Sequence, residues 1–301
     1  MEIDSWFHSI QFNYTAPKKM PEGPEVARMA AEVRQAYRGA VCTRVEIRSG
    51  KYTRHGAPQG FADFRKDLPL VLASVQVKGK FCWFSWETKQ EEPLWDTWVQ
   101  FGMTGYFASQ EFAKAPIPHI RSSEQAQEAE PKHGHIWFYF EKHDPLIFVD
   151  SRNFGTLRFV ADPDETQEYL KKKLGPDPLR ETLTREWWDE ELKDRRPTTE
   201  LAVLLLDQSF VAGIGNYLRA EILWKARILP SRTLGSLSPK EQKALLEALR
   251  TVPKEKAEEE EKTGDVSFWV YQRKKEDAKG HPTKQMKVKG RTVWYAPQWQ
   301  S

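Results

Sequence analysis

The sequence predicts an α+β protein with more than one domain, in which a strand-rich N-terminal half precedes a helical C-terminal half. Three observations support this prediction: one amphipathic helix near the start, a series of short runs rich in β-branched and aromatic residues, and longer helical patterns further on. A length of 301 residues is sufficient for two medium-sized domains, each with its own hydrophobic core.

The first helix is expected at residues 24–38, where apolar side chains recur with helical spacing and Gly39 follows. Its apolar face consists of Val26, Met29, Ala30, Val33 and Tyr37. Six runs with β-forming composition follow, at residues 71–77, 81–86, 95–101, 135–140, 146–149 and 156–160. An all-β sandwich or barrel with one flanking helix is therefore expected for residues 20–160.

The second half begins after a linker, which we place at residues 161–185 because it contains the turn-prone sequence Gly-Pro-Asp-Pro at 175–178. Helical patterns follow at residues 200–208, 217–226 and 239–251. These patterns assign residues 186–262 to a helical domain.

The end of that domain contains the charge run 254–262, with four consecutive glutamates, which we interpret as a solvated face or loop. Two β-segments are expected beyond it, at residues 267–272 and 287–295. We assign residues 263–301 to a last, separate unit.

The composition excludes several classes of protein. With only Cys42 and Cys82, neither a disulfide framework nor a cysteine zinc site can form, and a reducing compartment fits. No apolar run approaches the roughly 20 residues that span a bilayer, so no membrane partner is expected. The first nineteen residues lack the apolar core of a secretory signal. A net charge of +3 is compatible with nucleic-acid binding without requiring it.

The segment Met20–Glu25 has the character of a second start of the chain. If Met20 begins the chain and is removed, Pro21 acquires a free secondary amine, a nucleophile that can form an iminium with an aldehyde carbon. Glu22 and Glu25 follow within one helical turn and can move protons. The alternative is that Pro24 only begins a helix, because proline suits the first helical turn.

The most specific segment is 204–221, in which one helix ends and another begins around Gly213-Ile-Gly215-Asn216. The two glycines permit a tight turn, and backbone amides with an Asn side chain at a helix N-terminus favour a phosphate. The alternative is an ordinary pair of helices capped by glycine.

Together these segments resemble the formamidopyrimidine-DNA glycosylase/endonuclease VIII family, whose C-terminal half contains a helix–two-turn–helix DNA-binding motif. The resemblance extends from Met20 to about Gln300. It implies a β-sandwich with a flanking helix, then a helix–two-turn–helix domain that ends in a β-hairpin finger. It also implies a bifunctional DNA glycosylase and AP lyase of base excision repair. We expect a monomer that acts without a cofactor on double-stranded DNA with oxidised bases or abasic sites, in an intracellular compartment that contains DNA.

The family's start pattern Pro-Glu-x-Pro-Glu falls on Pro21, Glu22 and Glu25. The resemblance implies that Pro21 attacks C1′ and forms the Schiff base, that Glu22 is the proton donor, and that Glu25 supports them. The family's β-hairpin lysine, which contacts a phosphate, falls on Lys80. Lys78 is the competing assignment, and Lys80 is preferred because a Gly-Lys pair before an apolar strand is the family's usual form.

Two further segments, 100–105 and 150–155, resemble the loops with which the family fills the space left by a flipped base. The resemblance implies that Met103 fills this space, that Arg152 reaches the opposite base, and that Phe154 wedges between base pairs. Each side chain taken alone would more often be a packing residue. The resemblance also implies DNA-binding roles for Gly215, Asn216 and Glu221.

The chain departs from the family pattern at three places. Gln100 stands where histidine is common, and Asn153 replaces a second arginine. The four cysteines of the family's zinc finger are replaced by Ala278, His281, Ala296 and Trp299. One histidine without cysteine cannot hold a structural zinc, so a zincless finger without metal is expected.

The finger is expected to keep its shape by packing of residues 293–295, and Arg291 matches the hairpin tip that binds the phosphate beside the lesion. The alternative is a loose basic tail. Only the short segment 252–269 separates the last helix from the finger, which favours oxidised pyrimidines and hydantoins as substrates.

The first nineteen residues conflict with this mechanism, because a prolyl nitrogen inside a peptide bond is an amide without a usable lone pair. Three explanations remain: a start assigned upstream of Met20, proteolytic removal, or a non-catalytic protein that binds damaged DNA. We favour the first, so that residues 1–19 are an extension outside the mature enzyme. A nucleoprotein that uses the helix–two-turn–helix only for scaffolding would leave Met103, Arg152 and Phe154 without a purpose.

Overall fold

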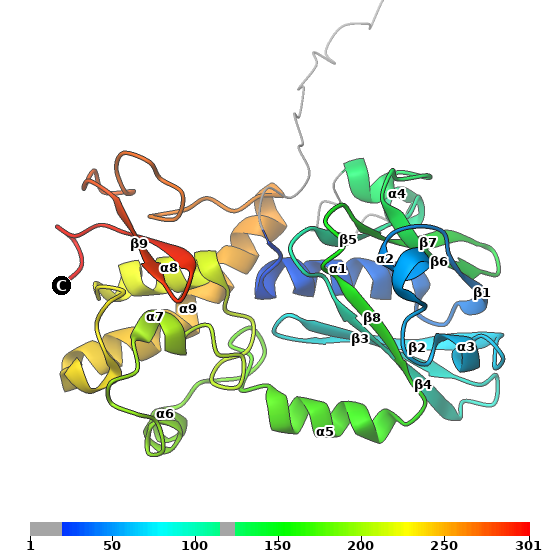
Figure 1. Cartoon of the computed structure of the whole chain (residues 1–301), viewed down its shortest axis with the longest axis horizontal. Helices are drawn as coiled ribbons and strands as arrows, with labels where there is room; N and C mark the ends of the chain where they lie inside the picture. The colour runs from blue at the N-terminus through cyan, green and yellow to red at the C-terminus, as the bar shows by residue number, and fades with distance from the viewer. Residues whose placement is uncertain (1–19, 115–123) are drawn as a thin grey trace, which may run out of the picture.

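The computed structural model describes residues 20–114 and 124–301, which form two folded parts side by side, joined by one connection that contains a helix (Figure 1). The N-terminal part contains helix α1 and an antiparallel sheet. The C-terminal part contains the long helix α9, helix α8 and a terminal β-hairpin. Both parts are held by cores of their own, as an α+β protein with more than one domain requires.

Helix α1 (Gly23–Tyr37) forms as predicted, with Pro24 in its first turn. The backbone N–H of Glu22 donates to Oε2 of Glu25 at 2.9 Å, which satisfies a donor at the helix start. The apolar face Val26, Met29, Ala30, Val33 and Tyr37 is at most 3% exposed and packs against the sheet.

The sheet has eight antiparallel strands in the order β5-β7-β6-β1-β2-β3-β4-β8. They are β1 (Val41–Ile47), β2 (Leu70–Lys78), β3 (Phe81–Glu87), β4 (Pro93–Gln100), β5 (Gly105–Ala108), β6 (Gly134–Phe140), β7 (His143–Asp150) and β8 (Thr156–Val160). β1 and β2 pair over only two positions, which divides the ladder into two halves. The two halves pack face to face as a sandwich. The contact between Phe84 of β3 and Phe107 of β5, with ring centroids 5.3 Å apart, lies between them.

All six predicted strands are present, whereas β1 and β5 were missed. β1 exposes two consecutive side chains, Thr43 and Arg44, so its sequence does not alternate cleanly. β5 has only four residues. Short helical segments connect the strands: α2 (Lys51–His55), α3 (Phe61–Phe64), α4 (Glu111–Lys114) and the 3-10 turn η1 (Glu124–Gln127).

The segment 161–185, expected as a linker, connects the two parts and contains a helix that was not predicted, α5 (Pro163–Lys173). Asp162 caps its start by accepting from the N–H of Asp164 at 2.9 Å. The helix docks on the sheet through Thr166 and Tyr169: the Trp98 indole donates to Thr166 Oγ1 at 2.7 Å, and the rings of Trp98 and Tyr169 lie 4.8 Å apart. This narrow apolar face lies among charged residues and carries little periodic signal.

The C-terminal part contains α6 (Arg185–Leu192), α7 (Leu201–Leu204), α8 (Asn216–Ala226), the 3-10 turn η2 (Leu234–Ser236) and α9 (Pro239–Thr263). α7 is shorter than the predicted helix 200–208, and α8 matches its prediction closely. α8 is buried on nearly all sides and forms the centre of this part's core. No helix in the described ranges is both long and apolar enough to cross a membrane.

The charge run 254–262 is the last part of α9, not a solvated loop. Ser238 caps the start of α9, and the helix passes through Pro253 before it ends at Thr263. Lys256 and Glu260 are buried, at 1% and 6% exposure, because this end of α9 packs on α1 and on the segment before the hairpin. The run is thus an exposed helix face at Lys254, Glu258, Glu261 and Lys262, as one of the two alternatives expected, but tertiary contacts bury two of its other charges.

The terminal hairpin consists of β9 (Lys284–Val288) and β10 (Arg291–Tyr295), within the predicted β-segment 287–295 and the residues before it. The other predicted segment, 267–272, is not a strand. Three consecutive amides there, those of residues 269–271, donate to the carboxylate of Glu221. Because these three consecutive amides point to one carboxylate, the backbone of residues 269–271 curves around it and cannot adopt the extended conformation of a strand.

The two parts meet where three glycine backbones approach closely. The N–H of Gly23 donates to the carbonyl of Gly213 at 2.9 Å, and the N–H of Gly79 donates to Oδ2 of Asp177 at 2.9 Å. A Cβ on Gly79 would lie 2.4 Å from the backbone nitrogen of Gly213. The start of α1, the β2–β3 turn and the loop before α8 are therefore fixed against one another.

Gly79→Ala tests this junction, with Gly39→Ala as its matched control. Both positions have positive φ, 59° and 83°, but a Cβ on Gly39 meets nothing within 4 Å. We expect Gly39→Ala to cost about 1 kcal/mol of unfolding free energy and Gly79→Ala at least about 2 kcal/mol more, as measured by denaturant unfolding. Equal losses would show that the two parts do not press together at Gly79.

Candidate active site

The carboxylate of Glu22 is the N-terminal cap of α8, although the two are far apart in the sequence. Its oxygens accept from the backbone N–H groups of Gly215 at 2.7 Å, Tyr217 at 2.8 Å and Leu218 at 3.1 Å. The N-cap residue of α8 is Gly215, which has no side chain to supply this acceptor. The positive end of the helix dipole therefore faces a carboxylate that is only 1% exposed.

Lys80 lies beside this carboxylate at the start of β3. A Cβ on Gly215 would lie 2.4 Å from Nζ of Lys80 and 2.3 Å from Cδ of Glu22, so only glycine fits between them. Burial raises the pKa of Glu22, which the charge of Lys80 and the α8 amides oppose. Burial lowers the pKa of Lys80, and the Glu22 carboxylate opposes this shift. The two groups lie next to one another out of contact with bulk water, and the charge of each opposes the shift that burial causes in the other.

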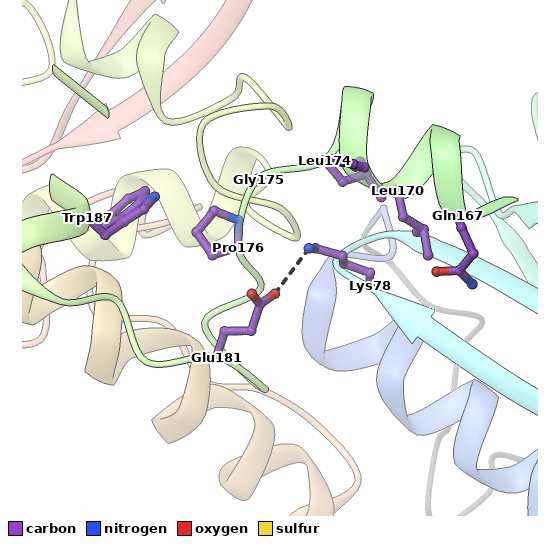
Figure 2. Close-up of a pocket in the computed structure, with 9 residues that line it drawn as sticks. Lys78, Gln167, Leu170, Leu174, Gly175, Pro176, Glu181 and Trp187 are labelled. Atoms are coloured by element: carbon purple, nitrogen blue, oxygen red, sulfur yellow. Dashed lines mark ion pairs between the residues drawn. The ribbon is translucent and has the colours of Figure 1, made fainter. Parts of the chain in front are cut away.

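Lys78, the competing lysine, points away from this pair. Its Nζ lies 3.2 Å from Oε1 of Glu181 in the connection between the two parts (Figure 2). The ion pair borders a groove of about 620 Å³, which is also lined by Leu170, Pro176 and Trp187. Of the two candidates, the structure therefore places Lys80 at the carboxylate.

Glu25 faces α8 from the first turn of α1. The Tyr217 hydroxyl donates to it, with Oη 3.0 Å from Oε1. Burial and the neighbouring Glu22 charge raise the pKa of Glu25. A third carboxylate, Glu260 of α9, joins this cluster. Its Oε1 accepts from Nε of Arg28 at 2.9 Å, and burial with the charge of Glu25 raises its pKa to about 7.

Sequence reasoning missed Tyr217 and Glu260. Tyr217 directly follows the Gly-x-Gly-Asn pattern and could have been found as an additional polar residue of that motif. Glu260 lies inside the run of four glutamates, and nothing in the sequence distinguishes it from its neighbours.

The hairpin tip lies over the same end of α8. Nδ2 of Asn216 donates to the Thr292 carbonyl at 2.9 Å, and the Arg219 guanidinium donates to Oδ1 of Asn216 and to the Ala202 carbonyl. Arg291 is exposed, and its charge contributes to lowering the pKa values of Lys80 and Arg219. The structure thus brings Lys80, Asn216 and Arg291 to one place.

Glu221 has a different role from the predicted DNA contact. It is fully buried, and its carboxylate accepts from the amides of Trp269 at 2.7 Å and of Val270 and Tyr271 at 2.9 Å each. Nζ of Lys256 lies 3.8 Å away. A side chain in this position cannot touch DNA, so Glu221 instead holds the finger on α8.

The two loops expected at the flipped base lie side by side on the N-terminal part. A Cβ on Gly102 would lie 3.0 Å from Cβ of Phe154, which places the residues next to Met103 against the second loop. Phe154 is 55% exposed, whereas most large apolar side chains are buried. The Arg152 guanidinium lies 5.1 Å from the centre of its ring.

The positions of the replaced cysteines are occupied by a hydrogen-bonded aromatic cluster. Trp299 stacks on His281 with ring centroids 5.3 Å apart and donates to the Trp224 carbonyl at 3.0 Å. Asp277 accepts from the Trp224 indole at 2.8 Å, and Ala278 N–H donates to the Trp269 carbonyl. Within the described chain, no group of three or more His, Cys, Asp or Glu side chains could hold a metal ion.

Pro21 is buried and directly precedes the carboxylate that caps α8. Residues 1–19, which the sequence analysis assigned to an extension, lie outside the described residues.

The fold and this site define a protein in which a helix–two-turn–helix element and a basic hairpin converge on a buried carboxylate–lysine pair. A sequence model of the formamidopyrimidine-DNA glycosylase N-terminal domain matches residues 20–157, and one of the H2TH domain matches residues 174–267. The chain belongs to the formamidopyrimidine-DNA glycosylase family, and it is therefore a DNA glycosylase of base excision repair.

Relatives agree with this assignment, and a solved structure shows the same fold. The formamidopyrimidine-DNA glycosylase of Arabidopsis thaliana is 30% identical over 292 residues, 93% of this chain and 71% of the relative. That of Listeria monocytogenes serotype 4b is 30% identical, over 77% of each chain. The Lactococcus lactis enzyme bound to DNA with an AP site has the same fold, with a TM-score of 0.74 at 23% identity, covering 93% of this chain and 99% of that one.

Glu260→Gln tests the buried carboxylate cluster. The folded chain holds a proton on Glu260 up to about pH 7, against an ordinary value of 4.5, so stability should fall as pH rises through this window. We expect the unfolding free energy of the wild type to decrease by roughly 2–3 kcal/mol between pH 5 and pH 8, relative to Glu260→Gln. Glu258→Gln, on the exposed face of the same turn, should retain the wild-type slope in denaturant titrations. Parallel slopes for all three proteins would contradict the buried proton.

Proposed function

We propose that the active form begins at Pro21 and is a bifunctional DNA glycosylase and AP lyase, which removes oxidised bases from double-stranded DNA as a monomer. The observation that carries this proposal is the position of Glu22. The residue that directly follows Pro21 is buried at the N-terminus of α8, beside Lys80. The match to the family's N-terminal domain begins at residue 20, which supports a chain that starts there.

The first steps follow from amine chemistry. The Pro21 amine attacks C1′ and loses its proton, the bond from C1′ to the base breaks, and the departing base takes up a proton in exchange. Glu22 gives a proton to the ring oxygen of the sugar, the ring opens, and an iminium to Pro21 remains. The raised pKa of Glu22 suits a carboxyl that must carry a proton at this stage.

Strand cleavage follows from the same intermediate. The iminium makes the C2′ proton acidic, so β-elimination expels the 3′ phosphate. A second elimination at the 5′ side leaves a phosphate on both sides of the gap. Lys80, Asn216 and Arg291 hold the flanking phosphates, because they converge at the end of α8. Gly215 contributes by admitting Glu22 and Lys80 to the same space, with its own N–H donated to Glu22.

Base flipping falls to the two adjacent loops. Met103 fills the vacated stack, Phe154 enters between base pairs, and Arg152 holds the opposite base. The exposure of Phe154 beside the Arg152 guanidinium supports these roles, because an exposed ring and its neighbouring cation are accessible to a duplex on this face.

The substrate preference is for oxidised pyrimidines and hydantoins. Support comes from α9, which continues to Thr263 and leaves only a short segment before Val270 for a loop that could cover a purine lesion. The finger, which we assign to residues 263–301 after a helical domain at 186–262, works without zinc. The cluster of Trp299, His281 and Asp277 supports this, because hydrogen bonds and stacking fill the place of the replaced cysteines.

The competing function is a non-catalytic protein that binds damaged DNA. It applies if the residues before Pro21 are retained, because the nitrogen of Pro21 is then an amide. The DNA-contacting residues would remain unchanged, whereas the covalent step would be lost.

Borohydride trapping on a duplex with one abasic site separates these functions. We expect a chain that begins at Pro21 to form a covalent adduct with the DNA, and the 301-residue chain to form none. The adduct is detected as a shifted band in a denaturing gel. If neither form is trapped while both still bind the duplex, the protein is a damage-binding protein without lyase activity.

Glu22→Gln in the Pro21-initiated chain tests the proton donor. Excision of thymine glycol should fall about 100-fold or more in single-turnover assays, because general acid catalysis contributes on this scale. Trapping on a pre-formed abasic site should decline much less, since that sugar opens to an aldehyde without Glu22. Equal losses on the two substrates would assign Glu22 to holding α8 alone.

A further inference from the structure

The position of the exposed Phe154 ring depends on the residues that carry it. A side chain that wedges into DNA must resist the base stack that it separates, which costs a few kcal/mol to open. Its ring is 55% exposed, so packing within the protein supports it little. The position of the wedge therefore depends on the backbone of the loop that carries it, residues 150–155, here called the wedge loop.

The wedge loop is held to helix α2 by two hydrogen bonds, and a third holds the strand that follows it. The N–H of Lys51 donates to Oδ1 of Asn153 at 2.9 Å, and Nζ of Lys51 donates to the Gly155 carbonyl at 2.5 Å. Just beyond the loop, the hydroxyl of Tyr52 accepts from the Leu157 N–H at 2.8 Å. The two contacts of Lys51 fall on the residues immediately before and after Phe154.

The backbone on both sides is shaped for this contact. Asn153 has a φ of 58°, in the left-handed region that Asn tolerates better than most residues. Gly50, with a φ of 83°, precedes Lys51, and a Cβ there would lie 2.6 Å from Oδ1 of Asn153. Positive φ at a residue other than glycine costs conformational energy, and the surrounding contacts offset this cost at Asn153.

The base of the loop is fixed from inside the domain. Asp150 accepts from the N–H of Gly155 at 2.6 Å and of Arg152 at 3.2 Å. Its own carbonyl lies 2.7 Å from Nε2 of His135, whose pKa is lowered by burial. Asp150 thus closes the loop internally, whereas Lys51 fixes its outer end to α2.

We propose that Lys51 and Asn153 clamp the wedge loop to α2 and are positioning residues for base flipping. This inference rests on the proposed function, since it assigns a role within that reaction. It also accounts for the departure at position 153, where the family pattern has a second arginine. The Asn153 side chain turns inward to Lys51, so Arg152 alone is available to the opposite base.

The clamp differs from a DNA contact in what it predicts. Nζ of Lys51 is engaged by the Gly155 carbonyl, so removing its charge should leave the salt dependence of binding to undamaged duplex unchanged. A lysine on a phosphate would instead lower the slope of log K against log salt by about 1.

The test measures insertion directly in the 301-residue chain, so it does not depend on the chemistry of Pro21. The probe is a duplex with a tetrahydrofuran abasic analogue and 2-aminopurine in the adjacent pair, whose fluorescence rises when the stack opens. We expect Lys51→Met to slow this rise about ten-fold, as the loss of a hydrogen bond from a charged group predicts, and Asn153→Gly to slow it about five-fold, because its bond to the Lys51 N–H is neutral. Glycine at position 153 removes the side chain without strain in the left-handed backbone.

Two control variants distinguish the loss of the Lys51 hydrogen bond from a general loss of positive charge on α2. Lys51→Arg should restore the wild-type rate, because it keeps a cationic donor. Arg54→Met removes a charge from an exposed position on the same helix and should have no effect. Unchanged insertion in Lys51→Met, an equal loss in Arg54→Met, or a lowered salt slope would overturn the clamp. If the wild type opens the stack but the Pro21-initiated chain excises no base, the proposed chemistry fails and the clamp stands.

Discussion

The contact on which the rest of the site depends is the one between the Glu22 carboxylate and the first amides of α8. The interacting residues are 193 positions apart in the chain, and they belong to different folded parts. Because α8 has no side-chain cap of its own, any displacement of the two parts would leave buried N–H groups unpaired. This cost fixes the start of α1 against the helix–two-turn–helix element, and Lys80 and Asn216 with it.

The same junction brings several carboxylates together where they are shielded from solvent. Glu22 and Glu25 lie at the start of α1, and Glu260 lies near the end of α9. The charge of Glu22 raises the pKa of Glu25, and the charge of Glu25 raises the pKa of Glu260. Arg28 and Lys80 supply compensating cations. Such a cluster holds protons at higher pH than exposed carboxylates do, which is the property a proton donor near neutral pH requires. The burial that makes the unfolding free energy depend on pH through Glu260 therefore also raises the pKa of Glu22, the proposed proton donor.

Much of the fold was predictable because the signal lay within single segments. The apolar face of α1, six strands and the helix after Gly215 all follow from local spacing. The failures have a common cause, which is docking against distant parts of the chain. α5 shows only a narrow apolar face among charges, and the end of α9 buries Lys256 and Glu260 inside a run of glutamates. Neither could be inferred without knowing the surface that receives it.

The sequence by itself determined the family and the absence of cysteine ligands from the finger, and it named Glu22, Asn216 and Arg291, because motif and spacing are local properties. Tertiary structure alone decided between Lys78, which pairs with Glu181, and Lys80, which lies at Glu22. It also turned Glu221 inward to the amides of residues 269–271, where a DNA contact had been expected. The direction in which a side chain points is set by partners that lie between 48 and 193 positions away, and no spacing along the chain records it.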